Sequence, residues 1–233
     1  GVTRAAEDST NGLTISYNND GGSLSAPVKM LLVLTILSLA PSILIMLTSY
    51  TRIIIVLHFL RTAIGTQTAP PNQVLIGIAL FLTLFIMAPV MTQINKDCIQ
   101  PYDKGKLTQE EALNAGLKPI RKFMFEQTNR KDIRLFMEIE KQSNDVSIEK
   151  EDEIPTLVLI PAFMISELRI AFIIGFLIYL PFIVIDMVVA STLMSMGMMM
   201  LPPTTISMPF KILLFVLADG WNLVIGQLVK TFY

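Results

Sequence analysis

Five charged residues lie within apolar stretches of the second half of the chain: Glu167, Arg169, Asp186, Lys211 and Asp219. A charge at the centre of a membrane helix costs about 2.5–3.5 kcal/mol on insertion scales, so such side chains face protein or water. Glu167 and Arg169 point to different sides of a helix, and their partners must come from other segments or other copies. We expect Glu167 to pair with Lys211, within one chain or between two subunits. A buried pair that fixes packing and a proton relay through the carboxylates are both open interpretations.

Patterns for catalysis or metal binding are missing from the sequence. The chain has one histidine, His58, and one cysteine, Cys98, which excludes an internal disulfide and a multi-ligand Cys/His zinc site. No Ser-His-Asp set with a supported base, glycine-rich phosphate loop or pair of catalytic carboxylates can be recognised. We therefore expect no enzyme activity, no metal and no cofactor.

A methionine-rich stretch, MSMGMMMLPP at residues 194–203, lies between two apolar blocks. Gly197 permits unusual backbone angles, and Pro202 and Pro203 oppose a helix, so a short apolar loop at membrane depth is predicted. Such a loop lies in protein or at a pore, because its bare backbone cannot face lipid. Methionine is unbranched and flexible, so side chains from several copies could close a hole and still yield to a passing polypeptide. A loop at the membrane interface is the alternative. The methionines are Met194, Met196, Met198, Met199 and Met200.

Long apolar blocks carry these residues. The 233 residues are 52% hydrophobic and 16% charged, with a mean hydropathy of +0.59, whereas about a quarter of the residues in a soluble domain are charged. Most of the charges lie in residues 95–153. This pattern indicates an all-α membrane protein with one polar insert. The net charge of −1, without a basic stripe, argues against a nucleic-acid partner.

The apolar pattern divides the chain into four parts. Residues 1–26 form a polar tail, 27–94 a first helical hairpin, 95–153 a polar helical insert, and 154–233 a second hairpin that contains the 194–203 loop. In the first hairpin we expect a helix kinked at Pro41 that continues to Gly65. The following turn carries only positive charge, which predicts that it faces the cytoplasm and that the tail and the insert lie outside. A start at glycine fits a removed signal peptide or a trimmed chain.

The insert has helix signals of its own. Thr108 and Glu111 match a capping box, and Asn129 or Asp132 can cap a second helix. Apolar stripes that include Phe123 and Phe136 belong either to a small core or to a contact with a neighbouring subunit. Residues 143–153 are expected to form an exposed acidic loop.

The third apolar block, residues 154–190, is too long for one simple span. As a single helix it would measure about 55 Å, nearly twice the bilayer core. We expect Pro161 and Pro181 to divide it. Prolines at apolar positions are typical of broken helices that line a cavity, as in channels and transporters.

Four long stretches resemble the FliP family, and together they cover most of the chain from about residue 24 onward. They read SLAPSILIMLTSYTRIIIVLHFLRTAIGTQTAPPNQVLIGIALFLTLFIMAPV, PAFMISELRIAFIIGF, LPFIVIDMVVASTLMSMGMMMLPP and PFKILLFVLADGWNLVIG. The resemblance implies a core subunit of the flagellar type III protein export gate in the bacterial inner membrane, at the flagellar basal body. It implies five copies that assemble with FliQ and FliR homologues into a helical pore complex for flagellar polypeptides in transit.

The resemblance also implies roles for particular residues. The methionine loop would constrict the conduit, Glu167 would pair with Lys211, and Phe123 and Phe136 would contact neighbouring subunits. It implies a cleavable signal peptide and bent helical hairpins in place of four simple spans. Two other functions follow from the residues alone: a subunit of a proton-coupled membrane transporter, or a scaffold that recruits partner subunits and lines no pore.

Overall fold

The computed structural model describes residues 26–140, 154–198 and 200–233, and these residues form helices joined by short loops, with no β-strand among them. The prediction of an all-α protein is confirmed. The chain divides into two compact units, Gly1–Ile43 and Leu44–Tyr233. The helices after α1 (Ala26–Met46) are α2 (Tyr50–Ile64), α3 (Asn72–Ile94), the π-helical turn η1 (Asn95–Ile99), α4 (Gln100–Asp103), α5 (Gln109–Gln127), α6 (Arg130–Ile139), α7 (Thr156–Ser195), α8 (Pro203–Leu217) and α9 (Gly220–Lys230).

The first apolar block does not form one helix up to Gly65. α1 contains Pro41 and ends at Met46, and α2 begins at Tyr50. The Thr48 hydroxyl donates to the carbonyl oxygen of Ile45 at 2.9 Å. Side-chain hydrogen bonds of this kind offer the backbone an alternative to the helix. The predicted continuous helix is therefore wrong.

The third apolar block forms one unbroken helix. α7 has 40 residues, about 60 Å of helix at 1.5 Å per residue, and it contains both Pro161 and Pro181. The prediction that these prolines divide it is wrong. Neighbouring helices, side-chain hydroxyls and small local adjustments can accommodate proline within apolar helices.

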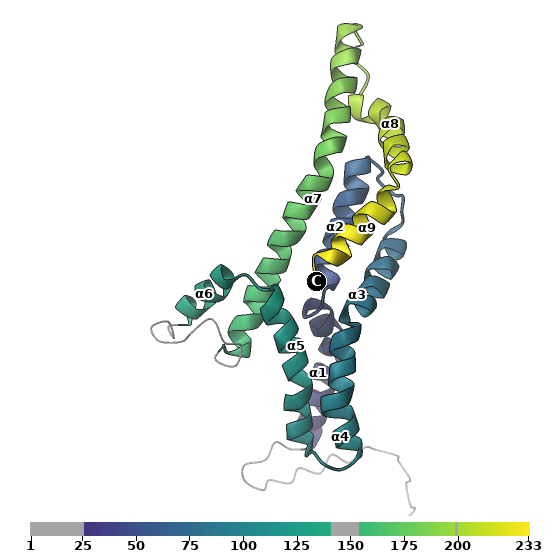
Figure 1. Ribbon diagram of the computed structural model, residues 1–233. Helices are drawn as coiled ribbons and strands as arrows, with labels where there is room; N and C mark the ends of the chain where they lie inside the picture. Colours follow the sequence, from purple (N-terminus) through teal and green to yellow (C-terminus); the bar gives the residue numbers. More distant parts are fainter. Residues whose placement is uncertain (1–25, 141–153, 199) are drawn as a thin grey trace, which may run out of the picture. The chain divides into compact units, whose positions relative to one another are not determined.

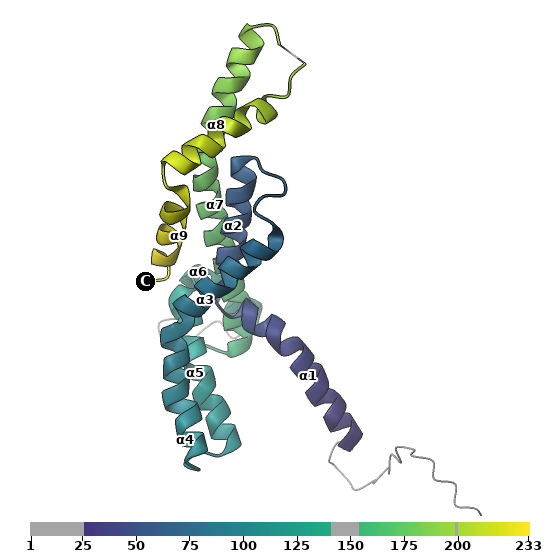
Figure 2. The same cartoon turned by 90° about the vertical axis from the view of Figure 1, so that its right-hand side faces the viewer.

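α2 packs along the middle part of the longer helix α7, as both ribbon views show (Figures 1 and 2). Ile53 and Leu57 on α2 and Leu159 and Phe163 on α7 are fully buried at this contact. A Cβ atom at Gly175 would lie 2.5 Å from the ring of Phe59, so only glycine permits the close approach of the two helices there. α3, α5, α6 and α8 then pack against this pair.

Among the residues that the structure describes, two helical runs are long and apolar enough to cross a membrane: residues 72–103 and α7. α8 and α9, bent by 66° at the break between them, pass the same test as a pair and would count as a third span. The bend coincides with Asp219, whose φ of 49° is left-handed. These helices fit a membrane location.

The insert contains the two predicted caps. Thr108 and Glu111 form the complete capping box at the start of α5, and the Asn129 side chain accepts a hydrogen bond from the backbone N–H of Lys131 at the start of α6. Both predictions are confirmed. The predicted acidic loop at 143–153 lies outside the described residues.

Candidate functional site: buried ion pairs and the methionine loop

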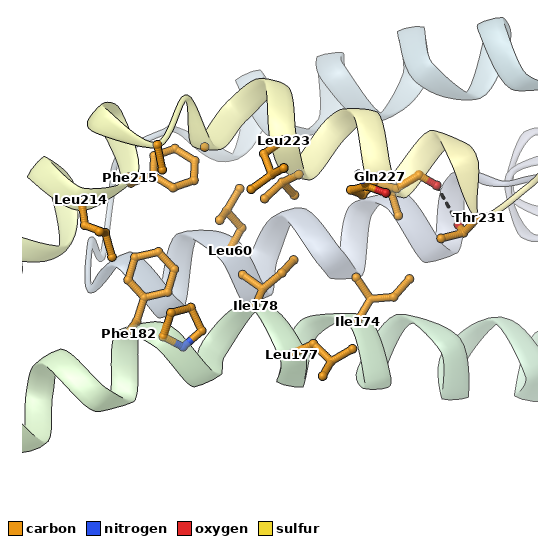
Figure 3. Close-up of a pocket in the computed structure, with 15 residues that line it drawn as sticks. Leu60, Ile174, Leu177, Ile178, Phe182, Leu214, Phe215, Leu223, Gln227 and Thr231 are labelled. Atoms are coloured by element: carbon orange, nitrogen blue, oxygen red, sulfur yellow. Dashed lines mark hydrogen bonds between the residues drawn. The ribbon is translucent and has the colours of Figure 1, made fainter.

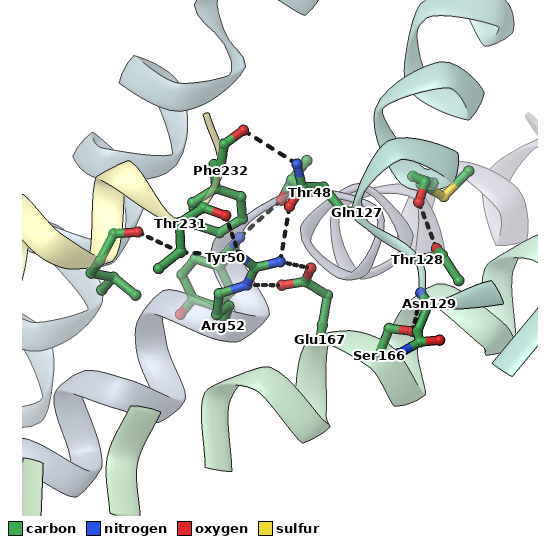
Figure 4. A network of polar contacts seen from close by, with 12 residues as sticks. Thr48, Tyr50, Arg52, Gln127, Thr128, Asn129, Ser166, Glu167, Thr231 and Phe232 are labelled. Atoms are coloured by element: carbon green, nitrogen blue, oxygen red, sulfur yellow. Dashed lines mark hydrogen bonds and ion pairs between the residues drawn. The ribbon is translucent and has the colours of Figure 1, made fainter. Parts of the chain in front are cut away.

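Arg52 on α2 and Glu167 on α7 form a two-point ion pair inside the protein (Figure 4). Arg52 Nε donates to Glu167 Oε2 at 2.8 Å, and Arg52 Nη2 donates to Oε1. Their side chains are 1% and 0% exposed. A buried charge is tolerated when its partner is close and its remaining hydrogen-bonding groups are satisfied, and the arrangement meets both conditions.

The C-terminal residues complete the surroundings of Arg52. Its Nη1 donates to the carbonyl oxygen and the hydroxyl of Thr231 at 3.1 and 3.0 Å, and its Nη2 donates to Gln127 Oε1 at 3.1 Å. The guanidinium also lies 3.9 Å from the ring centroid of Phe232, a cation–π distance. Gln127 Nε2 donates back to the carbonyl oxygen of Phe232 at 3.2 Å. The insert, α2, α7 and the C-terminus therefore meet at one arginine.

Lys211 has a different partner from the one predicted. Its Nζ donates to Asp186 Oδ2 at 2.6 Å, and the hydroxyl of Ser207 donates to Asp186 Oδ1. The Lys211 side chain is 3% exposed and that of Asp186 is 23% exposed. The predicted Glu167–Lys211 pair is therefore wrong within one chain, because each residue is bound to another partner. A pair between subunits stays a prediction.

A third ion pair ties the insert to α7. Arg169 donates to both carboxylate oxygens of Asp132, at 3.0 and 2.5 Å, and the hydroxyl of Ser166 donates to Asp132 Oδ2 at 2.6 Å. Glu167 and Arg169 thus reach different neighbours, α2 and α6. The Asp132 side chain is 3% exposed, whereas that of Arg169 is 44% exposed.

The charged residues in the apolar stretches differ in how far the single chain buries them. Asp186 is half-buried, but Arg169 and Asp219 are exposed. The chain by itself does not bury these two residues, and their burial against other chains stays a prediction. Asp219 is the N-cap residue that precedes α9, and its Oδ2 accepts a hydrogen bond from Asn222 at 3.0 Å.

The loop between α7 and α8 presents its methionines outward. The exposed fractions are 60% for Met194, 67% for Met196, 41% for Met198 and 99% for Met200. Met199 lies outside the described residues. Exposed, unbranched side chains at the end of a long helix are available to other chains, and their flexibility suits contact with surfaces of varied shape.

The predicted breakers lie at the ends of this loop. Gly197 has a φ of 76°, its N–H donates to the carbonyl oxygen of Met194, and the N–H of Met198 donates to that of Leu193, both at 3.1 Å. This is the Schellman arrangement that ends helices at a left-handed glycine. Pro202 and Pro203 then form the N-cap and the first residue of α8, where proline does no harm because helix N-terminal N–H groups lack partners.

The two candidate contact phenylalanines differ in exposure. Phe123 is 8% exposed, and its ring packs edge-on against Phe163 and stacks on Phe232 with centroid separations of 6.1 and 6.4 Å. It belongs to the core of its own chain, so the predicted subunit contact is wrong for this residue. Phe136 is only partly buried, and its subunit contact stays a prediction.

Arg52, Gln127 and the C-terminal residues were not identified from the sequence as parts of this network. Arg52 carried a usable signal, since it is a charge in the apolar run YTRIIIVL and therefore needs a partner. No sequence pattern identifies Gln127 or Thr231. Within the described ranges, no three His, Cys, Asp or Glu side chains gather closely enough to hold a metal ion.

Comparison with known proteins gives consistent matches over most of the chain. The model of the FliP family matches residues 33–228. The flagellar biosynthetic protein FliP of Bacillus subtilis is 53% identical over 220 residues, which cover 94% of this chain and 98% of the relative. The proteins of the same name from Aquifex aeolicus and Pectobacterium carotovorum are 50% and 48% identical, over 91% and 92% of this chain and 88% and 82% of their own lengths.

Proposed function

The chain belongs to the FliP family of flagellar biosynthetic proteins, and we propose that it is a core pore-forming subunit of the flagellar protein export gate. In this role it conducts unfolded flagellar polypeptides across the bacterial inner membrane at the flagellar basal body. The methionines of the α7–α8 loop, contributed by several copies, form a gasket around the conduit.

The observation that carries this proposal is the exposure of the methionines on a loop with fixed ends. The Schellman turn at Gly197 and the prolines that start α8 define where the loop begins and ends. Methionine side chains are unbranched thioethers with several rotatable bonds, so they can fit an irregular chain that passes between them. An ion filter would instead need fixed oxygen ligands.

The same proposal includes partners. A single loop cannot enclose a conduit, so we infer a ring of identical copies. The resemblance to the FliP family implies five copies, assembled with FliQ and FliR homologues in the lipid membrane. The long exposed apolar surfaces of α3 and α7 support burial against other chains or lipid.

Membrane conductance of the assembled complex tests the gasket. Replacing Met194, Met196, Met198 and Met200 together with alanine is expected to leave assembly intact and to make the closed gate leak ions. Replacement of the same four residues by leucine keeps comparable apolar bulk and is expected to leak less. Met187→Ala is the matched control, because Met187 is 66% exposed on α7 outside the loop.

An unchanged conductance in assembled alanine complexes would reject the gasket. Met200→Cys, labelled with membrane-impermeant thiol reagents in a Cys98→Ser background, separates a pore from a scaffold. A pore-lining loop becomes reactive when the gate is opened. A scaffold that lines nothing gives the same labelling in the open and closed states.

A further inference from the structure

An apolar cavity of about 560 Å³ lies between α2, α7, α8 and α9 (Figure 3). Phe182 and Phe215 lie at one end, and Gln227 and Thr231 lie at the other. The walls between them are almost entirely aliphatic, as at Ile178. Ligand cavities in proteins typically measure about 300–1,000 Å³, so the volume suits a small molecule or one hydrocarbon chain.

A polar hollow of about 300 Å³ adjoins this cavity on α9. Asp219, Asn222 and Lys230 line it and are all exposed. The cavity and the hollow share three lining residues, Ala218, Leu223 and Gln227. α9 therefore has one apolar and one polar recess side by side, which is the surface that an amphiphile with a hydrocarbon chain and a polar head requires.

The charges of the hollow are opposite and separate. Asp219 and Lys230 are 11 positions apart, about 16 Å along a helix. The Cα–Cβ bond of a helical residue is tilted toward the helix N-terminus, which lets the lysine side chain reach back toward Asp219. Among the described residues, Asp219 accepts a hydrogen bond from Asn222, and Lys230 has no ion-pair partner. α8 and α9 are a candidate membrane span, where unpaired charges are costly. A zwitterionic head group supplies a cation for Asp219 and an anion for Lys230.

We propose that this chain binds a phospholipid with a phosphoethanolamine head group. One acyl chain enters the cavity, the phosphate lies at Lys230, and the ammonium group lies at Asp219. An acyl chain suits the cavity better than an extended peptide does, because a peptide would bring amide groups that an almost wholly apolar lining cannot satisfy. The proposal stands apart from the gate function.

Native mass spectrometry of the detergent-extracted complex, with phosphatidylethanolamine added, tests the site. Ala218→Trp places a large side chain at the wall shared by both recesses and is expected to abolish lipid retention. Leu217→Trp is the matched control, because the neighbouring Leu217 is 76% exposed and lines neither recess. Lys230→Gln is expected to weaken retention about tenfold, the effect of losing one charged hydrogen bond, whereas Lys118→Gln in α5 should not change it.

A second lipid keeps the test decisive if Ala218→Trp does not assemble. Phosphatidylglycerol has a phosphate but no amine, so the unmodified complex should retain less of it than of phosphatidylethanolamine. In Lys230→Gln, the retained amounts of the two lipids should differ by less than they do in the unmodified complex. If the unmodified complex and the Lys230→Gln complex retain both lipids to the same extent, the retained lipid is the ordinary lipid that surrounds a membrane protein. This result would overturn the proposal. A cross-link from Gln227→Cys to another protein chain, in place of lipid, would overturn it as well.

Discussion

Glu167 on α7 accepts two hydrogen bonds from the guanidinium of Arg52 on α2, although 115 positions separate the two residues in the chain. The same guanidinium also contacts Gln127 from the insert and Thr231 near the C-terminus. The pair therefore joins the two hairpins, the insert and the end of the chain at one point. Removal of this ion pair should therefore lower the stability of the whole unit formed by residues 44–233.

Glu167→Gln is expected to destabilise the chain by about 3–5 kcal/mol, because Arg52 keeps its charge in a buried site without a counter-ion. Thermal unfolding of the detergent-extracted protein measures this loss. The double variant Arg52→Met/Glu167→Leu should recover much of it, since replacing both members removes the unpaired charge. Lys122→Gln, which breaks an exposed pair with Glu126, should have an effect below about 1 kcal/mol. Equal midpoints for Glu167→Gln and Lys122→Gln would contradict the account.

Charge reversal decides which acid is the partner of Lys211. Lys211→Asp places two carboxylates together at a site that is 3% exposed and should reduce the amount of assembled complex. Adding Asp186→Lys restores the pair in reversed order and should recover assembly. Adding Glu167→Lys to the Lys211→Asp variant should not recover assembly. Rescue by Glu167→Lys alone would instead support the predicted pair between subunits.

The role of Asp186 in proton transfer can be separated from its role in packing. Asp186→Asn should lower the yield of assembled complex, because Lys211 loses its counter-ion. Export by each complex that does assemble should stay unchanged, and Asp186→Glu should be milder in both respects. Normal assembly combined with abolished export in Asp186→Asn would indicate a proton relay in place of a structural pair.

Phe123 and Phe136 should respond differently to truncation. Phe123→Ala removes a buried ring from the core and should destabilise the chain by about 3–5 kcal/mol. Phe136→Ala should change stability less and, if Phe136 contacts a neighbouring subunit, should reduce the mass of the detergent-extracted particle. Unfolding and particle mass measured on both variants distinguish these effects. A full-sized particle with Phe136→Ala would remove this residue from the interface.

The backbone amides at the start of α5 should lose their protection from hydrogen exchange in acid. Hydrogen bonds from the backbone N–H and the side chain of Thr108 hold the pKa of Glu111 below its ordinary value of 4.5. The stability that they contribute is therefore complete above that value and is lost as the pH falls through the lower pKa of the folded state. Amide hydrogen exchange at residues 109–112 should show this loss in the unmodified protein and a smaller pH effect in Glu111→Gln. An equal pH effect in both proteins would contradict the assignment of this effect to the Glu111 carboxylate. Glu110→Gln is the control, because it changes the neighbouring glutamate and leaves Glu111 in place.

Local signals were sufficient for the helix ends that the sequence predicted. Thr108 with Glu111 predicted the start of α5, and Asn129 the start of α6, because a cap depends on residues only a few positions apart. Gly197 and the two prolines at 202 and 203 lie at the ends of the methionine loop for the same reason. The apolar composition likewise indicated the all-α class and the membrane-type helices, since both follow from residue type and run length.

Tertiary structure decided which charges meet and which helices remain whole. Hydropathy identified Glu167 and Lys211 as charges in need of partners. It could not assign Arg52 on α2 to Glu167 or Asp186 on α7 to Lys211. Pro161 and Pro181 looked like breaks because a helix alone loses hydrogen bonds at proline, whereas α7 continues through both in contact with its neighbours. Pairing over long sequence separation depends on how helices pack, and packing energy is distributed over many contacts that no short stretch of sequence contains.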